Sequence, residues 1–513
     1  MRRRWCLAGL VAAGWAVPAA AQDCASLRGT YGGAVVVTAA TPIRPDAARP
    51  FQPDTPGGYK PIPVRVPLCR AAGTIEGNIG FELWLPLANA WNGRLLGAGV
   101  GGDAGVFNYD DLSRRVSEGF AAVTTDSGHK SSQPHWMTDA KVRTDYEHRA
   151  THLTAQAAKA LVARFYTRPA AHSYFLGCSG GGRQGLKELE DYPADYDGIV
   201  AGAPGPYMPL ISVRMMWSAL LQKQNPAAAL SDVDWSLYEK ATFAACDAKD
   251  GVRDGVVENP LTCGFKPAAL ACKPGQTGGC LSAPKVKMLA TIVGAMPDEQ
   301  GRPMDRGLLP GVRTRPGPPS PLLRQMWADA VHNTPDWDET TFRRSADLAA
   351  ANAAMPQLRA DRTDIAPFLA RGGKAIIYQG WQDPSVIAGP TIDFYHRLAA
   401  AQGGMAKLRR SVRLMMVPGM YHCQGGPGVD QFGGSGQATA AGDPRRDVLW
   451  SVIDWVEHGR APDAVIGTRM AVGVPVFTRK LCTFPQSARY IGGNQADARS
   501  YRCALDPVLA AYR

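Results

Sequence analysis

The stretch 177–181, GCSGG, carries the most specific chemical pattern in this chain. It fits G-x-S-x-G, in which a serine sits on a sharp turn between a strand and a helix. Small residues on both sides allow the strained backbone and leave the hydroxyl exposed. The flanks agree, because 173–176 is typical of a short buried strand and 183–189 of the start of a helix. We therefore expect Ser179 to be a nucleophile.

A serine hydroxyl is a poor nucleophile at neutral pH, so it needs a nearby base and a carboxylate that orients the base. In α/β-hydrolases the serine comes first along the chain, then the acid, then the histidine. Asp383 and His422 follow Ser179 in that order, each just after a predicted strand, 374–378 and 412–417. The carboxyl ends of parallel strands meet at one edge of a sheet. We expect these three residues to form a catalytic triad.

Other interpretations of the acid and the base remain open. An Asp-Pro pair often starts a turn, so Asp383 could simply cap one. His332, His396 and His458 compete as the base, although the last two fall on predicted helices and His332 lies in a long central segment. The position directly after a strand favours His422.

The oxyanion formed when serine attacks a carbonyl needs two backbone N–H donors. One is expected from Gly180, the residue after the nucleophile. The other is expected from Gly101 or Gly102, in a glycine-rich stretch, 97–102, that follows a short strand. This stretch also matches G-x-G-x-x-G, but the residues after it do not open the amphipathic helix that a dinucleotide site requires. We expect no organic cofactor.

The chain has 11 cysteines, and one of them, Cys6, lies in the predicted leader. The even number that remains is typical of disulfides in an exported protein, whereas a zinc site is disfavoured because no C-x-x-C pair occurs. Sequence alone does not fix the connectivity. Order along the chain suggests Cys246–Cys263, Cys272–Cys280 and Cys482–Cys503, with Cys24–Cys69 and Cys178–Cys423 completing the set. The last pair would tie the serine turn to the histidine loop, and two buried free thiols are the alternative there.

Residues 1–21 have the pattern of a signal peptide: three arginines, an apolar run and small residues at the end. The apolar run is too short to span a bilayer, and an N-terminal anchor is the alternative. No later segment holds eighteen consecutive apolar residues, so we expect a secreted or periplasmic protein without a transmembrane helix. The formal net charge of +11 is spread along the chain, without a basic run, which gives nucleic-acid binding little support.

Strand and helix patterns alternate over residues 22–205 and 370–513, which predicts a mostly parallel α/β sheet. Residues 22–60 are proline-rich and expected to be loops. The segment 206–369 is rich in Pro, Asp and Gly and has few strand signals, so it is expected to be an insertion that splits the α/β domain. Predicted strands are 62–66, 81–85, 94–96, 121–126, 173–176, 198–202, 374–378 and 412–417; predicted helices are 151–166, 183–189, 392–401 and 448–458.

A second cluster of polar residues lies at 246–256, inside the insertion. Asp247, Asp250 and Asp254 are spaced by three and four residues, with glycines between them. Together with the carbonyls of Val252 and Val256, these carboxylates suit a hard cation that prefers oxygen ligands. The spacing is not that of an EF-hand, and two Asp-Gly turns closed by a disulfide are the alternative.

These motifs resemble the tannase/feruloyl esterase family of α/β-hydrolases, which includes mono(2-hydroxyethyl) terephthalate hydrolase. The resemblance covers nearly the whole mature chain and rests on 177–184, 247–255, Asp383 and 422–423. It implies an α/β-hydrolase fold with a large inserted lid domain that supplies most substrate contacts. It also implies the triad, the five disulfides and a structural Ca²⁺ in the lid, with these ligands: Asp247, Asp250, Val252, Asp254 and Val256.

The function implied by the resemblance is that of a secreted serine esterase acting on small aromatic carboxylic esters through an acyl-enzyme. Ferulate, gallate, other hydroxycinnamates and terephthalate monoesters remain open as acyl groups. A non-catalytic protein of hydrolase fold that binds an aromatic ligand, a calcium-stabilised adhesion module and a serine peptidase are the alternatives. The complete Ser, Asp and His set argues against the non-catalytic ones. The oligomeric state stays open.

Overall fold

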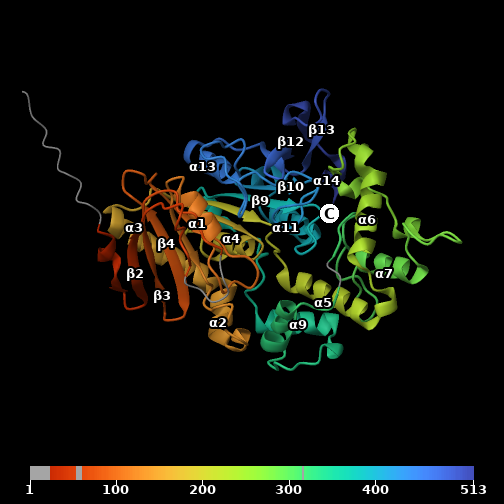
Figure 1. Cartoon of the computed structure of the whole chain (residues 1–513), viewed down its shortest axis with the longest axis horizontal. Coiled ribbons are helices and arrows are strands. Elements are labelled where there is room, and N and C mark those ends of the chain that lie inside the picture. The colour runs from red at the N-terminus through yellow and green to blue at the C-terminus, as the bar shows by residue number, and fades with distance from the viewer. Residues whose placement is uncertain (1–22, 54–59, 315–316, 513) are drawn as a thin grey trace, which may run out of the picture.

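The computed structural model describes residues 23–53, 60–314 and 317–512, so the predicted signal peptide lies outside the described residues. At the centre of the molecule is a sheet of ten strands (Figure 1). In space they run β1-β2-β3-β4-β6-β5-β7-β8-β9-β10. The strands are β1 Gly29–Tyr31, β2 Val35–Ile43, β3 Leu68–Ile75, β4 Ile79–Pro86, β5 Arg94–Ala98, β6 Ala121–Thr125, β7 His172–Cys178, β8 Gly198–Gly202, β9 Lys374–Gly380 and β10 Val412–Val417.

The sheet combines two kinds of pairing. The strands β1 to β4 are antiparallel to one another, and β4 is antiparallel to β6. The pairs from β6 through β5, β7, β8 and β9 to β10 are all parallel. The mostly parallel α/β sheet predicted from the alternating pattern is therefore confirmed, and its parallel half contains the strands that precede Ser179, Asp383 and His422.

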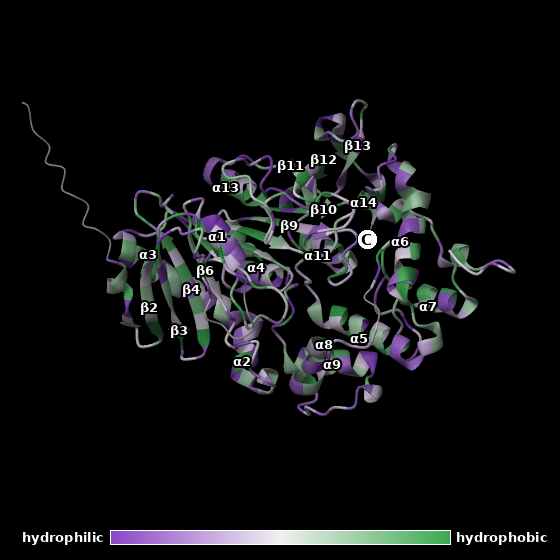
Figure 2. Cartoon of the chain, in the orientation of Figure 1, coloured by the Kyte–Doolittle hydropathy of each residue, from purple (hydrophilic) through white to green (hydrophobic). Residues whose placement is uncertain are grey.

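Helices cover both faces of this sheet. Alternate strand residues pack against α1 and α13 on one face and against α3, α4 and α11 on the other. Figure 2 shows the resulting distribution, with hydrophobic residues concentrated in the strands and hydrophilic ones on the outer helices and loops. The helices are α1 Tyr109–Val116, α2 Ala140–Thr144, α3 Ala150–Tyr166, α4 Gly180–Asp191, α5 Met208–Gln224, α6 Asp232–Cys246, α7 Ala283–Val293, α8 Pro321–Gln325, α9 Arg344–Ala354, α10 Ala366–Ala370, α11 Ala388–Ala401, α12 Met405–Leu408, α13 Val448–His458 and α14 Pro507–Ala511.

The segment between β8 and β9 differs from the rest of the chain in its secondary structure. Its last helix is α10, just before β9, and the described residues ahead of α10 contain helices α5 to α9 and isolated bridges but no strand of the main sheet. In Figure 1 these helices gather at the right-hand and lower side, away from β2, β3 and β4. The helix α5 joins the segment to the rest of the molecule, because its Met216 and Trp217 share a hydrophobic cluster with Trp136 and Met137. No described helix is long and apolar enough to cross a bilayer.

The structure differs from the predictions made from the sequence near both ends of the chain. The proline-rich stretch 22–60 was expected to be loops, yet it contributes β1 and β2, and Pro42 pairs with Cys69 in the ladder. The predicted strand 62–66 is reduced to a bridge at Ile62, and the hairpin is instead β3 with β4. Two hairpins near the C-terminus were not predicted. They are β11 Ala464–Ala471 with β12 Val474–Cys482, and β13 Gln486–Tyr490 with β14 Tyr501–Leu505.

Five disulfides join the cysteines of the described residues, with Cα atoms 4.8 to 6.1 Å apart. They are the five pairs that order along the chain suggests: Cys24–Cys69, Cys178–Cys423, Cys246–Cys263, Cys272–Cys280 and Cys482–Cys503. One ties β3 to the N-terminal turn, two lie within the insertion and one joins the two C-terminal hairpins. The fifth, between Cys178 and Cys423, lies at the predicted catalytic residues.

Candidate active site

Ser179 sits on a strained turn between β7 and α4. Its backbone has φ 61° and ψ −125°, in a region that residues other than glycine seldom occupy. The glycines beside it are required by close packing. A Cβ atom on Gly177 would lie 2.4 Å from the carbonyl oxygen of Gly181, and one on Gly182 would lie 2.1 Å from that of Gly202. The strand, turn and helix therefore have the form that G-x-S-x-G predicts.

A chain of two hydrogen bonds joins Ser179, His422 and Asp383. The Nε2 atom of His422 is 2.8 Å from Oγ of Ser179, and its Nδ1 atom is 2.8 Å from Oδ2 of Asp383. Asp383 is fully buried, and its other oxygen accepts the N–H groups of Ser385 and Val386 at 2.9 Å each. This carboxylate is therefore fixed with one oxygen toward the imidazole, because backbone donors hold the other.

Two of the competing histidines are paired elsewhere. His332 lies 2.9 Å from Asp347 within the insertion, and His458 lies 3.1 Å from Asp454 at the end of α13. His396 is on α11 with its ring 5.4 Å from that of Phe484. Of the four histidines considered, His422 is the one that the structure brings to Ser179.

The loop that carries His422 is anchored on several sides. The Cys178–Cys423 disulfide joins the residues directly beside the serine and the histidine, with Cα atoms 6.1 Å apart. The side chain of Gln437 donates a hydrogen bond of 2.7 Å to the carbonyl of Cys423. On the other side of the histidine, the Tyr421 hydroxyl bonds Glu239 of α6, in the insertion. The histidine is thus held by the core and the insertion together.

The glycine loop after β5 lies against the start of α4. A Cβ atom on Gly180 would lie 2.7 Å from the carbonyl oxygen of Gly102, and one on Gly101 would lie 3.9 Å from Cβ of Ser179. The N–H groups earlier in the loop are used, since Gly99 donates to Leu176 and Val100 to Gln184. The next N–H groups along the loop are those of Gly101 and Gly102, which the sequence predicts as oxyanion donors together with Gly180.

A cavity of about 330 Å³ reaches Ser179 and His422. Its wall is largely apolar and comes from both parts of the molecule. The insertion contributes Met208 and Met215 of α5, Leu323 of α8 and Met326 of the short helix η8 Met326–Val331, while Met137 and Tyr146 come from the segment before α3. Sequence reasoning named none of these residues. The seven-residue spacing of Met208 and Met215, which places both on one face of a helix, is the signal that could have found two of them.

Two charged side chains also line this cavity. Arg183 is almost completely buried, and its guanidinium donates to the backbone carbonyls of Glu147 at 2.6 Å and Tyr146 at 3.1 Å. Asp103 directly follows the glycine loop, and burial raises the pKa of its carboxyl group above the ordinary value. The cavity therefore offers one acidic side chain, while its arginine is already engaged by main-chain oxygens.

The predicted calcium loop is a set of tight turns in the insertion. Asp247 accepts the N–H groups of Asp254 and Gly255 at 3.2 and 3.1 Å, and Asp250 accepts that of Val252 at 3.0 Å. Arg479 of β12 bonds the side chain of Asp254. The oxygen donors match the chemistry of calcium. The carboxylate oxygens of these three aspartates do not, however, all lie within 4.8 Å of one another. Among the described residues, potential ligand atoms come that close at His152, Glu188 and Asp195.

The sheet, with its hydrogen-bonded set of Ser179, His422 and Asp383, has the form of an α/β-hydrolase. The chain belongs to the tannase and feruloyl esterase family, whose model matches residues 64–308 and 319–504. It is a carboxylic ester hydrolase. Among curated relatives, an uncharacterised esterase of Xanthomonas campestris pv. campestris is 33% identical over 492 residues, covering 86% of this chain and 84% of that protein. A probable feruloyl esterase B-2 of Aspergillus flavus is 33% identical over 424 residues, covering 79% and 81%.

Solved structures agree with the family. Feruloyl esterase B from Aspergillus oryzae is 29% identical and superposes with a TM-score of 0.86, covering 93% of this chain and 98% of that one. Tannin acyl hydrolase from Aspergillus niger has a TM-score of 0.75 at 19% identity, a likeness that concerns the fold alone. The α/β-hydrolase fold expected from the sequence is thereby confirmed.

Proposed function

We propose that this protein is a serine esterase that hydrolyses aromatic carboxylic esters through a covalent acyl-enzyme. Ser179 Oγ attacks the ester carbonyl while His422 Nε2 takes the hydroxyl proton and then delivers it to the leaving alcohol. Asp383 holds the Nδ1–H of the imidazole and stabilises the imidazolium. In the second half of the reaction His422 Nε2 takes a proton from water while the water oxygen attacks the acyl carbon. The histidine returns that proton to Ser179 Oγ as the bond to serine breaks and the aromatic acid leaves. The observation that carries the proposal is the continuous hydrogen-bond chain from the strained serine to the buried aspartate.

The oxyanion is proposed to be held by two backbone N–H groups. Gly180 supplies one from the first turn of α4, where helix N–H groups have no partner within the helix. Gly101 or Gly102 supplies the other, since the glycine loop packs directly on this turn. Donors of this kind are worth about 3 kcal/mol each in the transition state.

The acyl group is proposed to be a phenolic acid of the feruloyl, galloyl or hydroxycinnamoyl type. The methionines of the cavity suit a flat ring, because thioether sulfur contacts aromatic edges favourably. A free carboxylate on the acyl group, as in a terephthalate monoester, would share the cavity with the carboxyl group of Asp103. Of the lining residues that the structure describes, the one permanent cation is Arg183, and the backbone already holds it. A terephthalate monoester is therefore the alternative substrate.

The residues that line the cavity suggest how the chain is divided into domains. We propose a catalytic domain of residues 22–205 and 370–513 and a lid domain of residues 206–369. The lid is needed for substrate binding because α5, α8 and η8 form a wall of the cavity. We further propose that residues 1–21 are a signal peptide and that the enzyme acts in the periplasm or outside the cell.

The lid is proposed to hold a structural Ca²⁺. Its ligands would be the carboxylates of Asp247, Asp250 and Asp254 and the carbonyls of Val252 and Val256. Burial raises the pKa of Asp250 to about 6, and the charge of Asp254 adds to that effect. A divalent cation would neutralise this concentration of carboxylates, and it would close the loop without taking part in the ester chemistry.

A turnover panel tests this function. Purified protein is assayed on methyl ferulate, methyl gallate, mono(2-hydroxyethyl) terephthalate and p-nitrophenyl butyrate. We expect kcat/KM to be highest on one of the two phenolic esters and Asp103→Asn to improve the terephthalate ester selectively. Asp393→Asn, at a half-buried position of α11 where the carboxylate pairs with Arg306 outside this cavity, is the matched control. Equal turnover of all four esters would refute the aromatic pocket, and turnover of none would favour a ligand-binding protein.

A further inference from the structure

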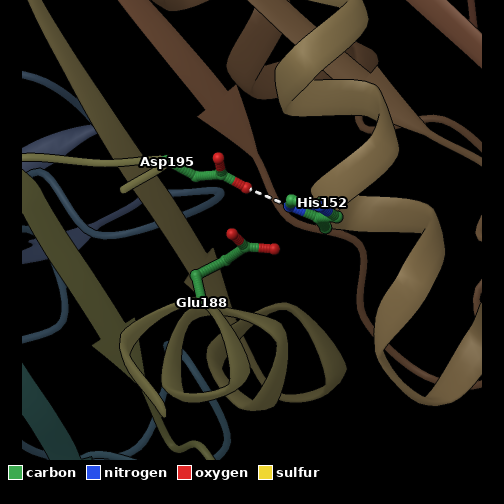
Figure 3. A group of neighbouring side chains, drawn as sticks. All are labelled: His152, Glu188 and Asp195. Carbon is green, nitrogen blue, oxygen red and sulfur yellow. Dashed lines mark hydrogen bonds and ion pairs between the residues drawn. The ribbon is translucent and has the colours of Figure 1, made fainter. Parts of the chain in front are cut away.

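The far end of the nucleophile helix carries a second cluster of ionisable side chains. His152 comes from α3, Glu188 from the last turns of α4, and Asp195 from the loop that follows α4 (Figure 3). One ligand atom from each lies within 4.8 Å of the other two. The Nδ1 atom of His152 is 2.5 Å from Oδ2 of Asp195. The reaction proposed above uses none of these residues.

Glu188 is the unusual member of this cluster. Its side chain is almost completely buried, and neither carboxylate oxygen has a hydrogen-bond partner. Figure 3 shows the carboxylate directed into the space between the histidine and the aspartate. A buried carboxylate without a partner is costly, so the pair formed with Asp195 requires a cation or a shared proton.

The histidine is fixed in position by its neighbours. Its ring stacks on Tyr192 with centroids 3.8 Å apart and planes 8° apart, and the Tyr192 hydroxyl lies 2.5 Å from Nδ1 of His148. Lys159 approaches the other oxygen of Asp195 at 3.9 Å, which leaves Oδ2 facing His152. The histidine side chain is 21% exposed, so an ion and a water molecule can reach the cluster from solvent.

We propose that His152, Glu188 and Asp195 bind one Zn²⁺. One imidazole nitrogen and two carboxylate oxygens form a ligand set that zinc accepts, with water as the fourth ligand. Calcium suits this set less well, because it prefers oxygen donors. Ligand atoms on one tetrahedral zinc lie about 3.3 Å apart, given bonds of about 2.0–2.1 Å. Small side-chain rotations therefore suffice, and the contact between His152 and Asp195 opens when the ion enters.

The ion would be structural rather than part of the reaction. Glu188 follows Ser179 by nine positions, which corresponds to roughly 13 Å along the helix. By joining α3 to the end of α4, zinc would hold the helix that presents the nucleophile. We expect zinc to raise the melting temperature and to leave ester hydrolysis at lower temperature unchanged.

Zinc binding is tested by equilibrium dialysis of the untagged full-length protein. The protein is stripped with EDTA, returned to excess calcium to fill the lid loop, and titrated with Zn²⁺ alone. We expect about one equivalent to bind. Glu188→Gln, which keeps the shape of the side chain, and His152→Ala at the partly exposed position should each weaken binding at least about tenfold. His458→Ala, which removes an exposed histidine also paired with an aspartate, should bind zinc as the parent does.

Two results would overturn the proposal. The first is absence of zinc binding by the folded parent protein at micromolar concentrations, and the second is unchanged binding in Glu188→Gln. Either would mean that Glu188 is not a zinc ligand. A proton shared between the two carboxyl groups would then be the alternative, in agreement with the pKa of Glu188 being raised well above its ordinary value by burial and by Asp195. Circular dichroism of each variant confirms that a loss of binding is not a loss of folding.

Discussion

The surroundings of Asp383 fix the role that this residue has in the proposed mechanism. Its carboxylate is fully buried, and two backbone N–H groups hold one oxygen so that the other faces His422. An amide at this position could accept the same two backbone bonds. It would present its NH₂ group to Nδ1, however, and stabilise the tautomer of His422 that cannot accept the serine proton.

Replacing Asp383 with Asn should therefore lower kcat by about 10³ to 10⁴, with little change in KM and little change in melting temperature. Steady-state kinetics on methyl ferulate, together with a thermal melt, measures all three. Asp393→Asn serves again as the control. A kcat within about threefold of the parent would exclude Asp383 as the orienting acid.

Asp126, at the end of β6, gives a prediction about pH. Its carboxylate accepts the N–H groups of Gly80 and Gly128, but burial outweighs these bonds and raises its pKa from 3.8 to about 6. A raised pKa means that the native state holds the proton more tightly than the unfolded chain does. The stabilisation is complete below about pH 4 and is lost as the pH rises through about 6.

The variant Asp126→Asn lacks this titration. We expect the parent protein to lose stability relative to the variant between pH 4 and pH 7, by at most roughly 3 kcal/mol. Denaturant unfolding of both proteins at several pH values measures the difference. A difference that stays constant with pH would show that Asp126 titrates normally in the folded protein.

At the scale of elements, the strands beneath the candidate site were easier to predict than the edges of the sheet. The parallel strands carry continuous apolar runs, so spacing and order along the chain were enough to expect Ser179, Asp383 and His422 together at their ends, where the structure joins them by hydrogen bonds. The strand β2 was missed, because its residues are partly exposed and prolines lie near its end and shortly after it. The cavity wall was missed as well, because methionines on α5 resemble ordinary core residues until the insertion is folded over the serine.

The Cys178–Cys423 disulfide links the nucleophile turn to the base loop across 245 residues of sequence. Removing it with paired Cys→Ser substitutions should lower kcat about tenfold or more, because small displacements of the base reduce the rate steeply. The disulfide Cys482–Cys503 in the C-terminal hairpins provides the comparison. Its removal should lower the melting temperature without changing kcat. Equal kinetic effects in both variants would remove the special role of the first disulfide.

At the scale of the whole molecule, the insertion and the α/β core meet at the site through specific contacts. Glu239 of α6 bonds Tyr421 beside the proposed base, and Asp254 of the acidic loop bonds Arg479 of β12. We therefore expect loss of order in the acidic loop to affect the C-terminal hairpins before the histidine loop. The histidine loop keeps its disulfide and its bond to Gln437.

Removal of calcium by a chelator should change the thermal stability of the protein without changing its turnover. With EGTA in excess we expect a lower melting temperature and an unchanged kcat at a temperature well below it, since calcium binds only the folded loop. Asp250→Asn should have the same effect in the presence of calcium. Elemental analysis should find one calcium per chain in the parent protein. A kcat that falls in step with calcium removal would contradict a purely structural ion.

The central claim, that Ser179 is the nucleophile of an esterase, is tested most directly by covalent labelling. The purified protein is treated with a fluorophosphonate, and the modified residue is located by peptide mass spectrometry while methyl ferulate hydrolysis is followed in parallel. The account predicts one adduct per chain, on Ser179, with activity lost in proportion, and neither adduct nor activity in Ser179→Ala. Labelling at another residue, or hydrolysis that persists in Ser179→Ala, would contradict it.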